Sequence, residues 1–454
     1  WYRGKFVAHM HPWLWRHEGK HWLTEQPRGH LIAPSIWSVV DELRESGWWV
    51  KSCAVFNQWH QEVEGQGNVC AEALAQRPAP RKGTVVFYSG IGCENWNPNS
   101  VDLTGIGGSE LATIHMAKQL VQAGYDVKVY NSCGQFGEGI YDGVEYHDVE
   151  KYHDISCDVL IVSRWAPAVG DSFNVKAKVK LLWTHDVWPI SLTHDLSLKY
   201  DKILVLTNWH RDFVKNHYKF ISDDQFIVTR NGIAPERFDE IVERNHHKVV
   251  YSSSPDRGLE ALLNSWKDIR KHVPDAQLHV FYGFKNWRVL SNGDEASNAR
   301  MDAIIKQMES LKDHGVVMRD RVPQHVIAKE FLSAGAWLYP TWFSETSCIT
   351  AMEAQAAGLS IVTSPIAALL ETVADRGVMI EGDWLSKEYA EKFVPAAVDA
   401  LTNTSDDQRQ QLMKYARDNF SWNGVAKQWI SIFDQICEEK SLGTFALSYK
   451  EFVK

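Results

Sequence analysis

Residues 339–365 constrain the fold more than any other part of this chain. The apolar run 336–339 just before and into this stretch is typical of the end of a buried strand. A proline-containing loop then leads into a helix predicted at about 348–357, and Gly358 stands where a helix C-cap glycine belongs. The apolar run 359–363 predicts a second strand. This order of strand, helix and strand is the repeating unit of a parallel α/β sheet.

Two acidic side chains flank a helix N-terminus in this unit. Glu345 lies in the loop before the predicted helix, and Glu353 lies about a turn and a half inside it. The backbone N–H groups near Ser347, Cys348 and Ile349 would have no partner within the helix, so they can bind a phosphate. A carboxylate can accept hydrogen bonds from the hydroxyl groups of a sugar. The pattern therefore suits a nucleotide-sugar site, and the alternative is a surface helix with two solvated acids.

The spacing E-x7-E from Glu345 to Glu353, followed by the run A-x-G-L-S-I-V-T-S, resembles the retaining family 4 glycosyltransferases, or glycosyl transferases group 1. The resemblance implies the GT-B fold, an α/β architecture with two Rossmann-like domains that face each other across a cleft. It also implies transfer of a sugar from a nucleotide diphosphate sugar to an acceptor, with retention of configuration.

The length of 454 residues favours more than one domain. We expect an N-terminal extension at 1–82, an acceptor-side Rossmann-like domain at 83–235, a donor-side one at 236–420, and C-terminal helices at 421–454 that cross back to the first domain. The net charge of −9 argues against a general coating of nucleic acid. No apolar run reaches about 18 residues, so no membrane span is expected. Scattered cysteines without a C-x-x-C pair favour a reducing, cytoplasmic location.

The predicted extension is rich in Trp and His, and the family resemblance does not include it. A helix at 35–46 and a strand at 48–56 are predicted there. The run from His17 to His21 matches H-E-x-x-H, a zinc-binding pattern when it lies on a helix. Gly19 inside the run and the absence of helical periodicity around it favour surface histidines instead. We therefore expect no bound metal.

A glycine-rich loop follows the predicted strand 84–89. It ends in the run from Gly105 to Glu110, just before a predicted amphipathic helix at 111–123. Glycines allow a backbone to approach a phosphate or a sugar closely. In the family that the chain resembles, this loop faces the donor diphosphate and the acceptor, which implies the same role for Gly107 and Gly108. A plain turn is the alternative.

Two further positions follow from strand ends and from the resemblance. His185 comes directly after the predicted strand 178–183, on the edge where open α/β sheets bind ligands. The family has a histidine there near the reacting sugar, which implies a catalytic role, whereas the position alone suits a structural histidine equally well. The family also has two basic residues in the loop before the helix predicted at 259–271. Arg257 matches the second, but Ser252 stands at the first and brings a hydroxyl without charge.

The resemblance therefore implies a metal-independent, retaining glycosyltransferase without a cofactor. It would move a hexose-type sugar from a UDP- or GDP-linked donor, with UDP favoured, to an acceptor hydroxyl. Glu345 and His185 would act at the reacting sugar, and Glu353 would bind the ribose. The diphosphate would be bound by Gly107, Gly108, Ser252, Arg257, Ser347, Cys348 and Ile349.

The acceptor stays open at this level, because variable loops of the first domain would bind it. A glycan, lipid, protein, small molecule or modified nucleic acid is each compatible with the motifs. Two alternative functions also remain. One is a catalytically idle protein of the same fold that binds sugars or nucleotides, which the uncharged Ser252 would suit. The other is a phosphorylase of this fold, although no pyridoxal-binding lysine can be identified.

Overall fold

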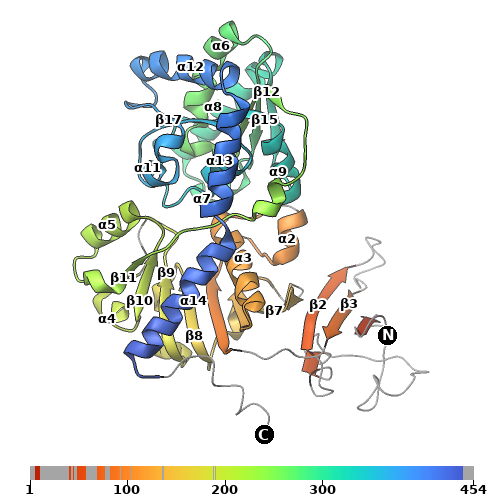
Figure 1. The fold of residues 1–454 in the computed structure, drawn as a ribbon, viewed down its shortest axis with the longest axis vertical. Coiled ribbons are helices and arrows are strands. Elements are labelled where there is room, and N and C mark those ends of the chain that lie inside the picture. The colour runs from red at the N-terminus through yellow and green to blue at the C-terminus, as the bar shows by residue number, and fades with distance from the viewer. Residues whose placement is uncertain are drawn as a thin grey trace.

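The computed structural model describes residues 6–10, 40–41, 44, 49–57, 69–76 and 82–442, apart from positions 93, 104, 135, 136, 188 and 190. In this part of the chain, two α/β domains are built on separate sheets and stacked along the long axis of the molecule (Figure 1). The predicted fold class is confirmed. The H-E-x-x-H run at 17–21 lies outside the described residues.

The first domain is built on a largely parallel sheet. Its central strands are almost wholly apolar because helices and turns cover both faces, as the run 159–162 in β8 illustrates. In sheet order the parallel strands are β7 (Val144–Asp148), β5 (Asp126–Asn131), β4 (Thr84–Gly90), β8 (Ser156–Ser163), β9 (Lys176–Trp183), β10 (Lys202–Val205) and β11 (Phe226–Val228). The predicted strands at 84–89 and 178–183 correspond to β4 and β9.

Antiparallel strands lengthen this sheet at the β7 edge. In order outward they are β6 (Gly139–Tyr141), β2 (Trp49–Asn57), β3 (Val69–Gln76) and β1 (Phe6–Met10). The strand predicted at 48–56 is thus present as β2. Within the helix predicted at 35–46, the described residues Val40, Asp41 and Arg44 have helical backbone. The described strands of the N-terminal segment therefore continue the sheet of the first domain.

The helices of the first domain are α2 (Pro98–Leu103), α3 (Gly108–Gln122), α4 (His194–Ser197) and α5 (Asn208–His217). Helix α3 begins three residues earlier than the predicted 111–123, because Gly107 has extended backbone and Gly108 is already helical. The difference places Glu110 in the first helical turn, where the helix dipole favours an acidic side chain.

The second domain has a fully parallel sheet in the described part of the chain. In sheet order its strands are β14 (Val316–Asp320), β13 (Gln277–Phe281), β12 (Asn245–Tyr251), β15 (Ala334–Tyr339), β16 (Ser360–Thr363) and β17 (Val378–Met379). The stretch 339–365 folds as predicted: β15 is followed by α10 (Ile349–Ala356), and Gly358 has the left-handed φ of +69° expected after a helix end.

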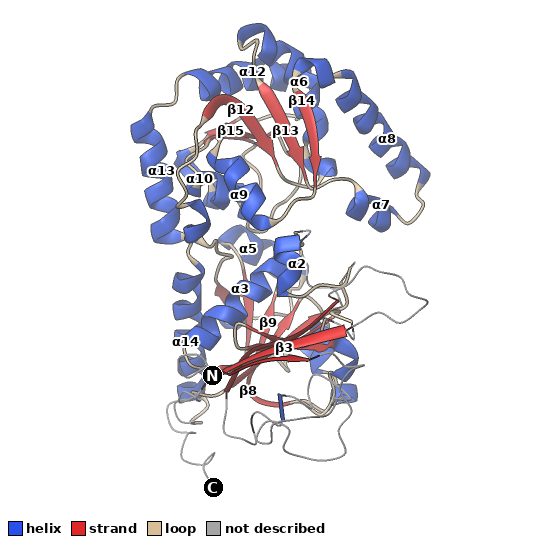
Figure 2. Ribbon diagram, turned by 90° about the vertical axis from the view of Figure 1, so that its right-hand side faces the viewer, coloured by secondary structure: helices blue, strands red, loops and turns tan. Residues whose placement is uncertain are grey.

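Helices surround this second sheet (Figures 1 and 2). They are α6 (Leu259–His272), α7 (Lys285–Ser291), α8 (Glu295–Ser310), α9 (Gln324–Leu332), α11 (Leu369–Thr372), α12 (Lys387–Thr402) and α13 (Asp406–Asn419). Helix α7 was not predicted from the sequence. No helix among the described residues is long and apolar enough to span a membrane.

Helix α14 (Trp422–Glu439) runs from the second domain along the first (Figure 1). Where α14 begins, Trp422 N–H donates to the carbonyl of Ile233 at 3.1 Å, next to the linker between the domains. Trp429 and Phe433 are buried in the core beside β9 and α3, and the indole N–H of Trp429 donates to Thr229 Oγ1 at 2.9 Å. The last helix therefore fastens the end of the second domain to the first sheet.

Candidate active site

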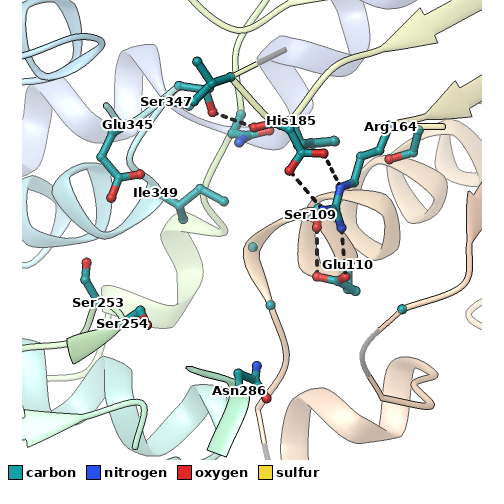
Figure 3. A pocket seen from close by; sticks show the side chains of 18 of the residues that line it. Ser109, Glu110, Arg164, His185, Ser253, Ser254, Asn286, Glu345, Ser347 and Ile349 are labelled. Atoms are coloured by element: carbon teal, nitrogen blue, oxygen red, sulfur yellow. Dashed lines mark hydrogen bonds and ion pairs between the residues drawn. The ribbon is translucent and has the colours of Figure 1, made fainter. Parts of the chain in front are cut away.

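A cavity of about 1070 Å³ lies between the two domains, at the C-terminal ends of their parallel strands (Figure 3). This is the edge at which open α/β sheets bind ligands. Nine of the ten residues singled out from the sequence line it: Gly107, Gly108, His185, Ser252, Arg257, Glu345, Ser347, Cys348 and Ile349. The structure therefore brings together residues from four separate loops. Glu353 does not line the cavity.

The N-terminus of α10 faces the cavity with its first residues. Cys348, just before the helix, has a left-handed backbone (φ 59°), which is uncommon for a residue other than glycine. Burial raises the pKa of the Cys348 thiol well above its usual range, so the thiol stays protonated. The loop is also held to the first domain, because Thr346 Oγ1 donates to the carbonyl of His185 at 2.8 Å.

Glu345 and Arg257 form the charged part of the second-domain wall. Glu345 is 8% exposed, and its Oε1 accepts a hydrogen bond from the Tyr339 hydroxyl at 2.8 Å and contacts Arg257 Nη1 at 3.3 Å. The Arg257 guanidinium also lies over the ring of Phe343, 3.9 Å from its centroid. Gly258 permits this arrangement: with φ at +140°, a Cβ there would lie 2.2 Å from the carbonyl oxygen of Pro340.

His185 is present as a neutral imidazole. Burial, with smaller contributions from Arg164 and His210, lowers its pKa to about 3. Its Nε2 is buried and has no hydrogen-bond partner. Its ring lies against the indole of Trp183, with the centroids 4.2 Å apart. A neutral ring in this position can donate or accept one hydrogen bond toward a ligand, but it carries no charge near pH 7.

Glu353 is the predicted site residue that does not line the cavity. It is 6% exposed, and its Oε1 accepts a hydrogen bond from Arg237 Nη1 at 2.7 Å. Arg237 belongs to the short turn Pro235–Phe238 between the domains and also donates to the carbonyl of Gln324 at 2.9 Å. The carboxylate thus joins α10 to the linker between the domains.

Several buried polar atoms at the cavity have no hydrogen-bond partner. Such atoms are rare in folded proteins, because an unpaired buried polar group is costly. Among the described residues that line the cavity, they belong to Ser163, His185, Asn231, Ser252, Arg257 and Ser347. Their concentration at one place indicates a polar ligand that supplies the missing partners.

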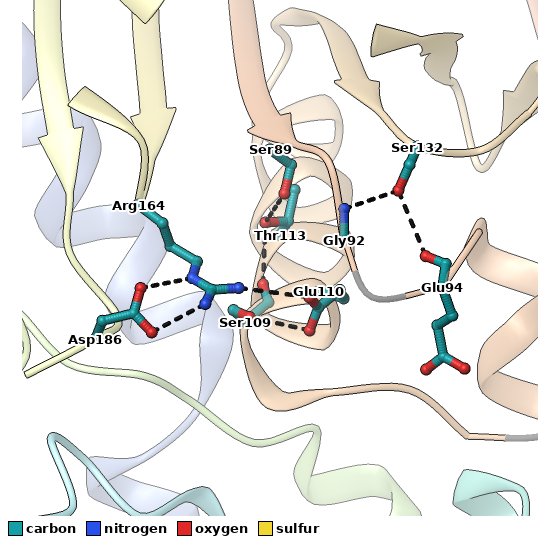
Figure 4. Close-up of polar contacts among 9 residues, drawn as sticks. All are labelled: Ser89, Gly92, Glu94, Ser109, Glu110, Thr113, Ser132, Arg164 and Asp186. Atoms are coloured by element: carbon teal, nitrogen blue, oxygen red, sulfur yellow. Dashed lines mark hydrogen bonds and ion pairs between the residues drawn. The ribbon is translucent and has the colours of Figure 1, made fainter. Parts of the chain in front are cut away.

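The first-domain wall contains a charged cluster that the sequence analysis did not identify (Figure 4). Arg164, just after β8, donates to both oxygens of Asp186, just after β9, at 2.7 and 3.0 Å. The Oε1 of Glu110 lies 3.9 Å from Arg164 Nη1, and Ser109 Oγ donates to the other Glu110 oxygen at 2.9 Å. The signal available in the sequence was their position: Arg164 and Asp186 follow apolar, strand-like runs, and Glu110 directly precedes the helix predicted at 111–123.

Side-chain contacts join the two domains that form the walls of the cavity. Arg321 of the second domain pairs with Glu94 of the first at 2.6 Å. Glu371 in α11 accepts hydrogen bonds from the backbone N–H groups of Asn208 and Trp209, the first residues of α5, at 3.0 and 2.7 Å. No group of three or more His, Cys, Asp or Glu suited to a metal ion occurs among the described residues.

Known proteins resemble this chain in the sequence of its second domain and in its overall fold. Residues 247–403 match the family model of glycosyl transferases group 1. A comparison with curated protein sequences found no significant match. Similar solved structures include the catalytic domain of starch synthase IV from Arabidopsis thaliana bound to ADP and acarbose, with a TM-score of 0.58 and 11% identity over 78% of this chain and 99% of that one.

Two other similar structures match over nearly the same share of both chains. Sucrose-phosphate synthase from Thermosynechococcus elongatus has a TM-score of 0.56 and 14% identity over 78% of this chain and 99% of that chain. HepE from Anabaena, in complex with UDP and glucose, has a TM-score of 0.56 and 11% identity over 78% of this chain and 100% of that chain. At these identities the likeness concerns the fold, which is that of two facing Rossmann-like domains.

Proposed function

We propose that this chain, whose residues 247–403 match the family model of glycosyl transferases group 1, transfers a hexose-type sugar from a UDP-linked donor to an acceptor hydroxyl with retention of configuration. The donor lies against the second-domain wall (236–420), and the acceptor enters from the first-domain wall (83–235). The observation that carries the proposal is the set of unpartnered polar atoms around the cavity, above all those of Ser252, Arg257 and Ser347.

These three residues suit a diphosphate. The guanidinium of Arg257 supplies a positive charge, the N-terminus of α10 supplies backbone N–H groups, and the hydroxyls of Ser252 and Ser347 each donate a hydrogen bond. Gly107 and Gly108 lie opposite and leave room for close approach, since a Cβ at Gly108 would meet only the tip of Ile349, at 3.5 Å. Charge that develops on the departing diphosphate is therefore met by groups already in place.

Glu345 and His185 act on the reacting sugar in this proposal. The Glu345 carboxylate is held by Tyr339 and Arg257 through Oε1, and its remaining acceptor capacity can bind a sugar hydroxyl and fix the orientation of the donor. The neutral Nε2 of His185 provides a second hydrogen bond. The departing phosphate, rather than a protein carboxylate, accepts the proton of the acceptor hydroxyl, so no covalent intermediate with Glu345 is required.

The ribose role of Glu353 requires a local rearrangement. Its Oε1 is bonded to Arg237, so the ribose hydroxyls must bind through Oε2 or replace that contact. We keep Glu353 as the proposed ribose ligand because it lies on the same helix as the phosphate-binding residues, four positions after Ile349. The variants Glu353→Gln and Arg237→Gln test this assignment.

The proposal is tested by nucleotide binding followed by turnover. Thermal unfolding is measured with UDP, GDP and ADP and with their hexose conjugates at millimolar concentration, with and without EDTA. A ligand at about 100 times its dissociation constant stabilises the native state by about 2.7 kcal/mol. We expect the largest shift with UDP, unchanged by EDTA, and slow release of UDP from UDP-hexose. A larger shift with GDP or ADP would overturn the choice of UDP, and no shift with any nucleotide would overturn the donor site.

A further inference from the structure

The first-domain wall indicates what kind of acceptor the enzyme uses. We propose that the acceptor is an uncharged carbohydrate, whose ring packs against Trp165 and whose hydroxyl groups bond to Glu110 and Asp186. This inference rests on the proposed function, because it assigns the acceptor side of the same cavity. Four observations support it: the backbone conformation after β8, the charged cluster of Glu110, Arg164 and Asp186, the exposed indole of Trp165, and the unpartnered buried hydroxyl of Ser163.

The chain turns sharply after β8 to bring two large side chains to the cavity. Arg164 has a left-handed φ of 69°, an uncommon conformation for a residue with a side chain, and such residues concentrate at functional sites. Its N–H donates to the carbonyl of Trp183 at 3.0 Å, and the N–H of Trp165 donates to the carbonyl of Ser163 at 2.8 Å. These bonds fix the turn, so Arg164 and Trp165 have defined positions on the wall.

The charged cluster is positioned for a ligand rather than for stability. The side chains of Arg164 and Asp186 are 37% and 33% exposed, and pairs with such access to solvent contribute little to folding. Arg164 nevertheless fixes Asp186 through two hydrogen bonds, and Ser109 orients Glu110. Oriented carboxylates accept strong hydrogen bonds from hydroxyl groups, and a guanidinium between them can donate to a ring or hydroxyl oxygen.

Trp165 adds an apolar surface beside these charges. It lines the cavity with 37% of its surface exposed, and its ring is supported by Tyr88 and Phe173, with centroids 5.8 and 5.9 Å away. One face of a pyranose ring consists of C–H groups and packs well on an aromatic ring, while its hydroxyls project from the rim. An indole next to fixed carboxylates is therefore complementary to a sugar.

A buried hydroxyl provides an independent sign that a polar ligand binds here. Ser163 is 1% exposed, lines the cavity next to Arg164, and its Oγ has no hydrogen-bond partner. A sugar hydroxyl that reaches between β8 and the charged cluster would supply that partner. An apolar acceptor group would leave the Ser163 hydroxyl unsatisfied.

The charge of this wall disfavours an anionic acceptor. Among the described first-domain residues that line the cavity, Arg164 is the one cation, and Glu94, Glu110 and Asp186 are anions. Arg321 pairs with Glu94, and Arg164 is shared by the other two carboxylates, which leaves an excess negative charge beside Trp165. A phosphorylated or carboxylated acceptor would be repelled there.

Ligand-observed saturation-transfer NMR on the full chain tests this inference. The neutral probes are the methyl glycosides of glucose, galactose, mannose and N-acetylglucosamine, and the anionic probes are methyl glucuronide and glucose 6-phosphate. Each is titrated with and without 5 mM UDP. The variants are Trp165→Ala, Trp165→Phe and the double variant Glu110→Gln/Asp186→Asn. Trp342→Ala is the matched control, because Trp342 is 43% exposed in the second domain and does not line the cavity.

We expect at least one neutral glycoside to bind the wild type and to lose about tenfold or more in affinity in Trp165→Ala. Trp165→Phe and Trp342→Ala should retain binding. The double variant should weaken neutral glycosides and strengthen the anionic probes, a reversal that a purely structural role would not produce. Preference of the wild type for an anionic probe, or equal loss in Trp342→Ala, would overturn the inference. Loss of UDP binding with intact Trp165-dependent glycoside binding would count against the proposed donor site alone.

Discussion

On the second-domain wall of the cleft, Ser252, Arg257 and Ser347 each keep a buried polar atom without a partner, whereas on the first-domain wall Arg164 is paired with both Asp186 and Glu110. The first wall also has unpartnered buried atoms, on Ser163, His185 and Asn231, but none of them belongs to a charged group. The first wall has most of its charges satisfied within the protein and presents them at a solvent-accessible surface.

The difference corresponds to two kinds of substrate. A nucleoside diphosphate brings fixed negative charge and many acceptors, so unpartnered donors around one guanidinium are suited to it. An uncharged polyol brings hydroxyls that can both donate and accept, so paired and oriented charges beside an aromatic ring suit it better. In the proposed function, the donor side would select through charge, and the acceptor side would select through shape and hydrogen-bond geometry.

Acid should affect the first domain most, and this is the largest effect that we expect. Burial lowers the pKa values of His115 and His185 to about 3 and of His210 to about 4. Between pH 6.5 and 5.0 the unfolded chain binds a proton at each ring and the native chain does not. The free energy of unfolding should therefore fall by about 1.1 kcal/mol per pH unit for each histidine over this range.

Urea unfolding at pH 6.5, 5.75 and 5.0 measures this slope. His115→Gln should reduce the pH dependence of the free energy of unfolding by about the contribution of one of the three histidines. In the second domain burial also lowers the pKa of His246, but this residue is exposed, so its contribution is smaller. A free energy of unfolding that stays constant over this range would contradict the assignment of neutral histidines.

The guanidinium of Arg257 should dominate nucleotide binding. Arg257→Ala removes the one cation that the described second-domain residues contribute to the cavity, and we expect about 100-fold weaker UDP binding by calorimetry. Arg257→Lys should lose less, because it keeps the charge. Trp165→Ala on the opposite wall should leave UDP affinity unchanged, and an equal loss there would remove the distinction between the walls.

Glu353 and Arg237 form the pair that separates a ligand role from a structural one. Glu353→Gln should weaken UDP binding about tenfold if the carboxylate binds the ribose hydroxyls. Arg237→Gln should lower the melting temperature but change UDP affinity much less. If both variants lower the melting temperature and neither changes the affinity, Glu353 serves to join α10 to the linker, and the ribose ligand is another group.

The smallest effect should come from Glu371, which accepts hydrogen bonds at the N-terminus of α5. Glu371→Gln weakens a charge–dipole contact between the domains worth about 0.3–1 kcal/mol, so the melting temperature should fall by about 1–3 °C. Glu381→Gln is the control, since Glu381 is an exposed acid in the same domain. A large loss of UDP affinity in Glu371→Gln would show that this contact also sets the spacing of the two walls.

The second-domain wall could be predicted from the sequence because its parts are close together in the chain. The residues from Glu345 to Ile349 follow one strand and begin one helix, so strand and helix signals place them on the same edge. Arg257 likewise lies in the loop between β12 and α6, two residues before the helix begins. Helix α7 was missed because seven residues are too few to show a clear helical periodicity.

The α/β class and the loops that carry the proposed donor-side residues could be predicted from the sequence, because periodicity and turn residues are properties of short segments. The two facing domains were implied by the family resemblance. The cluster of Glu110, Arg164 and Asp186 and the pairing of Glu353 with Arg237 become visible in the three-dimensional structure. These contacts join residues between 22 and 116 positions apart. Their formation depends on how parallel strands and the two domains align, which no local pattern specifies.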